Sequence, residues 1–106
     1  MLIVTTDTLS EHKISKTLGL VRGSSIRAKH LGRDIGAGLK SLVGGELMGY
    51  SELLEESREE AVNRMMEAAE KLNADAIVGV RFSSSQVMSG AAEMLVYGTA
   101  VKTEKK

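Results

Sequence analysis

The sequence contains no cysteine, and its 106 residues include one phenylalanine, two tyrosines and no tryptophan. The absence of cysteine excludes disulfide bonds, thiolate metal sites and a cysteine nucleophile. Because aromatic residues make up only 3% of the chain, the hydrophobic core has to be built from aliphatic side chains and methionine. Such a core has few bulky anchors, so packing against a partner subunit would help to stabilise it.

Long apolar segments are also absent from the sequence. No run approaches the roughly 20 residues of a membrane span, and the first residues, 1–6, lack the basic and apolar regions of a signal peptide. We therefore expect a cytoplasmic protein with no membrane partner. Apolar residues still make up 42% of the chain, which excludes disorder by composition. The length suits a single domain over residues 1–106.

Charge is balanced overall but unevenly distributed along the chain. The net charge is zero, yet residues 1–40 carry +4, residues 46–70 carry −6 and residues 71–106 carry +2. Proteins that bind nucleic acid usually present a strongly basic face, so we expect no nucleic-acid partner. The basic and acidic blocks can instead neutralise each other, within one subunit or between subunits.

Hydropathy patterns predict four strands and two helices. A stripe of apolar residues at helical spacing marks the long helix, with Ser51 as a candidate N-cap and Asn73 at its exit. The pair Gly44-Gly45 is expected to end the short helix, and residues 102–106 to form a frayed tail. The order of these elements predicts an α+β domain whose antiparallel sheet packs on one long and one short helix. The predicted strands are 2–6, 12–28, 75–87 and 93–103, and the predicted helices are 33–43 and 51–72.

The second predicted strand is unusually long for a domain of this size. About 16 extended residues span roughly 50 Å, whereas a domain of about 100 residues has a radius of gyration near 13 Å. Gly19 and Gly23 within this segment suggest bends or bulges. The segment must therefore curve, break, or reach a neighbouring subunit.

No catalytic constellation stands out in the sequence. The two histidines, His12 and His30, lie in polar neighbourhoods, and no nucleophile has an identifiable base beside it. Residues 36–41 lack the spacing of a nucleotide-binding loop, and Met65 fits core packing better than metal binding. We therefore expect no enzymatic activity, no cofactor and no metal site.

Several polar residues stand close to glycines that would let a ligand or another backbone approach. Arg33 and Asp34 open the short helix, and Arg58 lies on the acidic long helix. An ion-pair network at an interface is the favoured interpretation, and a ligand clamp is the alternative. The candidate ligand-binding or interface residues are Arg33, Asp34, Gly44, Gly45, Tyr50, Arg58 and Asp75.

The order and spacing of several short patterns resemble a known family. Arg33-Asp34, Val43-Gly44-Gly45 and Tyr50 are followed by the runs 74–80 and 98–101. Together they resemble the YbjQ-like family of small prokaryotic proteins, which carries the label heavy-metal-binding. The resemblance implies a dodecin-like subunit that assembles into a ring, typically a pentamer, held partly by strands exchanged between subunits. It implies no known reaction.

The chain departs from the family pattern at positions that bear on the metal label. Members often carry an acidic residue where this chain has Ser24, and acidic residues where it has Arg81, Phe82 and Ser83. These departures remove oxygen ligands, and without cysteine the chain is a poor heavy-metal site. Members also usually have glycine where Asn73 stands.

Three functions remain open from the sequence. The first is a homo-oligomer, expected to be a pentamer, that holds a small ligand at subunit boundaries. The second is a structural or adaptor ring that recruits a protein partner through the acidic face of residues 51–72. The third is the metal-binding protein that the family label suggests.

Overall fold

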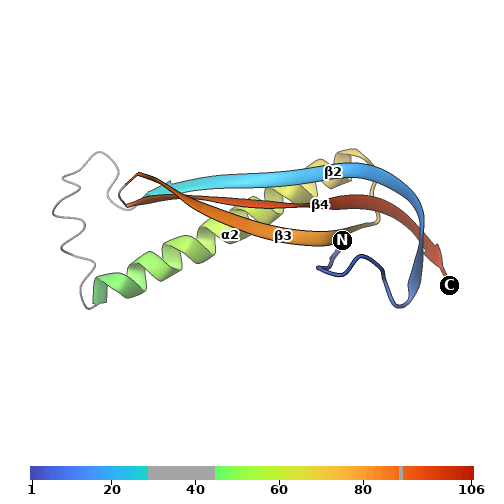
Figure 1. Cartoon of the computed structure of the whole chain (residues 1–106), viewed down its shortest axis with the longest axis horizontal. Coiled ribbons are helices and arrows are strands. Elements are labelled where there is room, and N and C mark those ends of the chain that lie inside the picture. Colours follow the sequence, from blue (N-terminus) through green and yellow to red (C-terminus); the bar gives the residue numbers. More distant parts are fainter. Residues whose placement is uncertain (29–44, 89) are drawn as a thin grey trace.

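The computed structural model describes residues 1–28, 45–88 and 90–106, and it shows an α+β fold with a four-stranded sheet and one helix (Figure 1). The short helix predicted over 33–43 lies outside the described residues. The described elements are β1 (Leu2–Ile3), β2 (His12–Ala28), α2 (Gly45–Lys71), β3 (Ala76–Met88) and β4 (Ala91–Lys105).

The sheet is mixed, with the strand order β1-β3-β4-β2. Strand β4 pairs antiparallel with both β2 and β3, whereas β1 pairs parallel with β3, with Leu2 opposite Ala76. The prediction of an antiparallel sheet is therefore wrong at this edge. Alternating apolar residues indicate that a strand exists, but only the tertiary fold decides which neighbour it meets. Backbone hydrogen bonds prolong this contact past β1, since Val4 donates to Ile77 and Gly79 donates to Thr6.

Strand β2 is the long strand that the sequence predicted, and it is curved (Figure 1). Its pairing with β4 is irregular between Ile14 and Lys16 and again between Thr17 and Gly19. The bulge predicted at Gly19 is confirmed, whereas Gly23 pairs regularly with Val96. The molecule is elongated, measuring 55 × 23 × 16 Å with a radius of gyration of 17.3 Å, well above the roughly 13 Å of a compact chain of this length.

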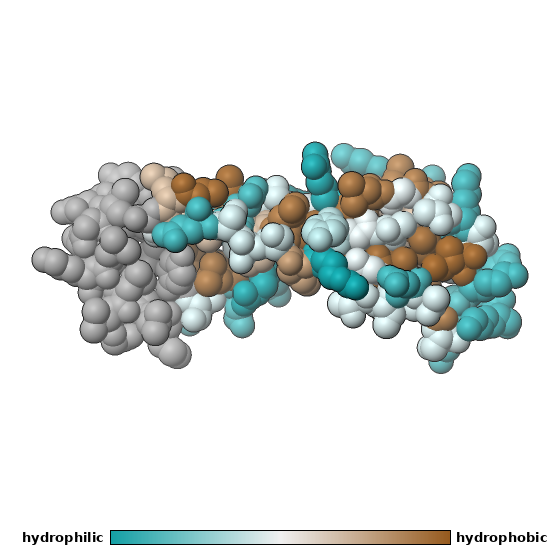
Figure 2. Space-filling model, viewed as in Figure 1, coloured by the Kyte–Doolittle hydropathy of each residue, from teal (hydrophilic) through white to brown (hydrophobic). Residues whose placement is uncertain are grey.

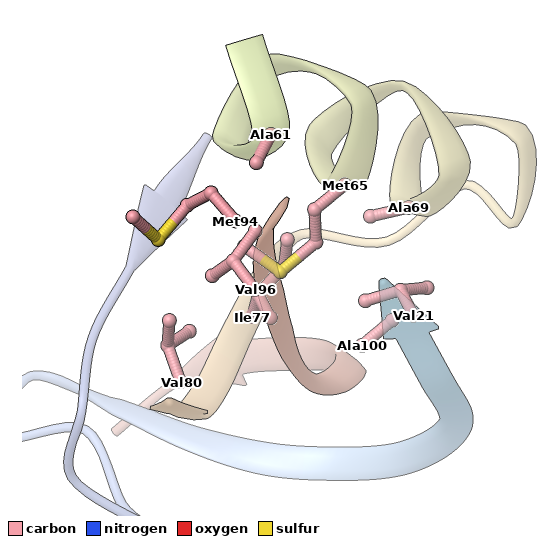
Figure 3. Packing of buried hydrophobic residues seen from close by; sticks show 9 residues of the cluster. All are labelled: Val21, Ala61, Met65, Ala69, Ile77, Val80, Met94, Val96 and Ala100. Atoms are coloured by element: carbon pink, nitrogen blue, oxygen red, sulfur yellow. The ribbon is translucent and has the colours of Figure 1, made fainter. Parts of the chain in front are cut away.

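Helix α2 packs on one face of the sheet, over β2 and β4 (Figure 3). The helix therefore lies mainly over β2 and β4, and β3 adds side chains to the same core. From α2, Ala61, Met65 and Ala69 are fully buried, which confirms the central part of the predicted apolar stripe and the core role of Met65. At the end of the stripe, Leu72 is 44% exposed. The sheet contributes Val21, Ile77, Val80, Met94, Val96 and Ala100 to this core.

A second, smaller cluster lies on the other face of the sheet, at the end where the chain begins. Leu9 from the N-terminal segment packs there against Ala76, Val78 and Val101. The segment between β1 and β2 thus covers one end of this face. The remainder of the face carries no helix among the described residues.

The ends of two elements differ from the sequence-based expectations. Helix α2 begins at Gly45, so Ser51 is an exposed residue within it and not its N-cap, and Gly45 opens a helix where it was expected to end one. Strand β4 continues to Lys105 because its last residues pair with the start of β2, His12 facing Lys105. The predicted frayed tail over 102–106 is therefore wrong up to its final residue.

The C-terminal end of α2 follows the prediction made for Asn73. This residue adopts a left-handed backbone, with a φ of 59°. The amide of Asn73 donates to the carbonyl of Glu70, and that of Ala74 donates to the carbonyl of Ala69. These two bonds are those of a Schellman motif, in which a left-handed residue satisfies the last helical carbonyls.

Candidate functional site

The structure places four of the seven predicted site residues. Gly45 and Tyr50 lie in the first two turns of α2, Arg58 lies further along the same helix, and Asp75 lies between α2 and β3. The other three, Arg33, Asp34 and Gly44, lie outside the described residues.

Arg58 is exposed on α2 and stands among glutamates. It lines a shallow depression together with Glu52, Glu55, Glu56 and Glu59. One guanidinium among four carboxylates leaves this part of the helix strongly acidic. The surface is suited to a cationic partner rather than to an anionic ligand.

Asp75 has a local structural role in the described part of the chain. Its carboxylate accepts a hydrogen bond of 2.8 Å from the amide of Thr103, and it lies 3.7 Å from the ammonium of Lys102. Lys102 also donates to the carbonyl of Asn73. Arg58 is separated from the end of α2 by 13 residues, about 20 Å of helix, so it does not converge with Asp75.

A polar cluster that the sequence revealed only in part joins α2 to β2. Glu60 forms ion pairs with Arg27 of β2 and, at 2.6 Å, with Arg64 one turn along the helix. Arg64 also donates to the carbonyl of Ser24. The hydrogen bond from Arg27 is the main cause that lowers the pKa of Glu60. Burial opposes this shift, and the positive charges of Arg27 and Arg64 lower the pKa further. Helical spacing predicts the pair Glu60–Arg64. Arg27 is 33 residues from Glu60 in the sequence, and no local pattern predicts that these two residues meet.

Two strand edges are open within the described part of the chain. Strand β2 lies at one end of the strand order, and β3 meets β1 only near its start. All eight residues of β3 over 81–88 are exposed. The two open edges lie at the same level of the sheet, because Ser24 and Ser83 both face Leu95, and Ile26 and Ser85 both face Glu93.

The described side chains do not fit a heavy-metal centre. No group of three histidine, aspartate or glutamate side chains comes together among them, and the chain has no cysteine. Of the methionines, Met65 is fully buried in the hydrophobic core. In the same part of the chain, no helix is long and apolar enough to cross a membrane.

Comparison with known proteins gives the same family that the sequence patterns resemble. The YbjQ family model, described as "Putative heavy-metal-binding", matches residues 1–104. A UPF0145 protein of Methanosarcina acetivorans is 65% identical over 102 residues, covering 96% of both chains. UPF0145 proteins of Clostridioides difficile and Thermotoga maritima are 62% and 55% identical, and they cover 98% and 99% of this chain.

A solved structure supports the fold. A crystal structure of a DUF74-family protein of unknown function from Pediococcus pentosaceus superposes with a TM-score of 0.63, covering 98% of each chain at 18% identity. At that identity the similarity concerns the fold alone. The family model and the near relatives both span almost the full length, and this chain therefore belongs to the YbjQ family of UPF0145 proteins.

Proposed function

We propose that this chain is the subunit of a closed cytoplasmic homo-oligomer, a dodecin-like ring expected to contain five copies, that holds a small ligand where copies meet. The ring has no catalytic activity in this proposal. The observation that carries it is the pair of open strand edges, on β2 and on residues 81–88 of β3, at one level of the sheet.

Open edges present rows of unpaired amide and carbonyl groups, which readily pair with another chain. Strands β2 and β3 both run antiparallel to β4, so they point in the same direction. Rotation about an axis along the strands keeps that direction, and β2 of one copy can pair in parallel with β3 of the next. Such a heterologous contact generates a ring when the rotation closes. Closure satisfies both edges of every copy.

Exposed apolar side chains also support an interface between copies. On β2, Leu20 is 70% exposed and Ile26 is 64% exposed, and on β3 Phe82 is 50% exposed. Figure 2 shows apolar side chains at several places on the face that it views. Contact between copies would remove these side chains from water, and the scarcity of aromatic residues in the core adds to the benefit of a partner.

The oligomer is tested by light scattering coupled to size exclusion at micromolar concentration. We expect a mass several times the 11.4 kDa of one chain. Lysines at the open edge of β3, Ser84→Lys with Gln86→Lys, should lower the mass because an edge lysine blocks strand addition. As a matched control, Ser51→Lys with Asn63→Lys adds the same charge on the exposed side of α2 and should leave the mass unchanged. A cooperatively folded wild-type monomer would rule out the ring.

The ligand is tested by thermal-shift screening of metabolites and metal ions against the wild-type protein. A ligand that binds only the folded assembly raises the unfolding temperature, and the increase grows with the logarithm of ligand concentration once this exceeds the dissociation constant. If no compound raises it, the ligand-binding part of the proposal fails while the ring stands.

A second candidate function is an adaptor ring, and one observation favours it. The exposed side of α2 carries glutamates at helical spacing along most of its length. Reversal of Glu55, Glu56 and Glu59 to lysine, followed by pull-down from a native lysate, tests this candidate. Partners that remain bound after reversal would count against it. The exposed glutamates are Glu52, Glu55, Glu56, Glu59, Glu67 and Glu70.

A further inference from the structure

A row of three polar side chains crosses the sheet on the face opposite α2. Tyr97 of the central strand β4 faces Arg22 of β2 on one side and Arg81 of β3 on the other. Residues that face each other across antiparallel strands lie on the same side of the sheet. All three are exposed, and Val96 beside Tyr97 points into the core under α2, which places the row on the other face.

The two arginines of this row carry positive charge that the described side chains do not neutralise. No carboxylate within the described ranges forms an ion pair with either guanidinium. Arg81 donates to two neutral acceptors, the carbonyls of Thr5 and Val80, both at 2.9 Å. These bonds fix its position and leave its charge available. Glu93 is the acid on the same face of β4, but it lies four residues along the strand from Tyr97, or about 13 Å.

We propose that the row Arg22–Tyr97–Arg81 binds a multivalent oxyanion, a small molecule bearing phosphate or several carboxylates. Guanidinium groups recognise such oxygens by paired, charge-assisted hydrogen bonds. The phenol of Tyr97 lies between them and donates a further hydrogen bond. Leu20 lies two residues from Arg22 on β2, and Leu95 lies two residues from Tyr97 on β4. Apolar neighbours lower the local dielectric constant, which strengthens the attraction between the guanidinium groups and an anion.

This anion site deepens the proposed function. The row itself lies within one copy, and the ring would bring the rows of several copies together. Helix α2 occupies one face of the sheet, so edge-to-edge closure leaves only the other face to line the interior. Rows from successive copies then stand at one level around the axis. Each copy contributes two guanidinium groups, and their mutual repulsion favours a bound multivalent anion at the centre.

Isothermal titration with inorganic triphosphate and with citrate tests the site at low and high salt. We expect saturable binding to the wild-type protein that weakens with salt. Arg22→Gln should weaken the binding at least tenfold, since it removes one of the two guanidinium groups. Among the described residues Arg22 forms no ion pair, so its loss should leave the fold intact. Tyr97→Phe should weaken the binding severalfold. The control is Lys13→Gln, which removes one positive charge from the other end of β2, where Lys13 pairs with Glu104. This variant should change the anion affinity little. The stronger ligand of the two identifies phosphate or carboxylate as the recognised group.

Light scattering on the same samples separates this proposal from the ring. An oligomeric wild type that binds neither anion would overturn the anion site and leave the ring intact. Equal affinities in Arg22→Gln and Lys13→Gln would also overturn it, since binding would then follow net charge and not the row. A monomer that binds through Arg22 would support the row and refute the ring. A monomer that binds neither anion would refute both.

Discussion

Gly23 of β2 lies directly against the backbone of α2 at Ala61. A Cβ atom on Gly23 would overlap the carbonyl oxygen of Ala61 and would lie 2.5 Å from the amide nitrogen of Met65. Neither atom belongs to a side chain that can rotate away. This close approach of helix and sheet therefore depends on the absence of a side chain at position 23.

Gly23→Ala should destabilise the protein because α2 has to move away from β2 to accommodate one methyl group. Overpacking of this kind typically costs about 1–3 kcal/mol, and displacement of backbone favours the upper end of that range. Urea unfolding followed by circular dichroism measures the loss. Ser24→Ala, at the next residue on the opposite face, is the control and should change the free energy of unfolding by less than about 0.5 kcal/mol. Equal stability of the two variants would contradict the close approach.

The stability of the protein should fall on acidification partly through Glu60. Its pKa is lowered in the folded protein, mainly by the hydrogen bond from Arg27. A carboxylate with a lowered folded-state pKa stabilises the fold fully above its unfolded-state pKa, and that contribution is lost as the pH falls through the folded-state value. We therefore expect Glu60→Gln to reduce stability at neutral pH and to narrow its difference from the wild type below about pH 4.

Denaturant unfolding of both proteins from pH 7 to pH 3 measures this linkage. Glu67→Gln is a suitable control, because Glu67 lies on the exposed side of the same helix. A constant difference between wild type and Glu60→Gln over this range would show that the ion pairs contribute nothing that depends on protonation. Salt should weaken the effect, since these side chains are partly exposed and screening acts on them.

Asn73→Gly should stabilise the protein slightly, and Asn73→Val should destabilise it. Asn73 holds a left-handed conformation, with a φ of 59°, which glycine adopts without strain and a β-branched residue adopts poorly. The expected changes are a gain of up to about 1 kcal/mol for glycine and a loss of about 1–2 kcal/mol for valine. Thermal unfolding of the three proteins ranks them. The reverse order would mean that the end of α2 is not set by this residue.

The purified protein should contain no stoichiometric heavy metal, despite the family's description. The described side chains offer neither thiolate nor a group of three nitrogen and oxygen ligands. Elemental analysis by mass spectrometry, followed by titration with soft divalent ions, measures this directly. Saturable binding at one ion per subunit would contradict the expectation and would make the metal-binding function the favoured one.

The amino-acid sequence by itself determined the element types of the described fold, because periodicity is a local property. Alternating residues marked the strands, and the stripe through Ala61, Met65 and Ala69 marked the helix and its buried side. The length of β2 required a departure from a compact shape, and Asn73 marked the end of α2. Family membership likewise followed from short patterns in order.

Only the tertiary structure decided which elements are neighbours, since contacts between distant residues leave no periodic signal. It paired β1 in parallel with β3. It also brought α2 so close to β2 that their contact requires a glycine at position 23, where the sequence had suggested a bend or bulge. It brought Arg27 to Glu60, and it set Arg22 and Arg81 on either side of Tyr97 across three strands. Each of these relationships joins residues far apart in the chain, where burial and hydrogen bonding over the whole fold determine the arrangement.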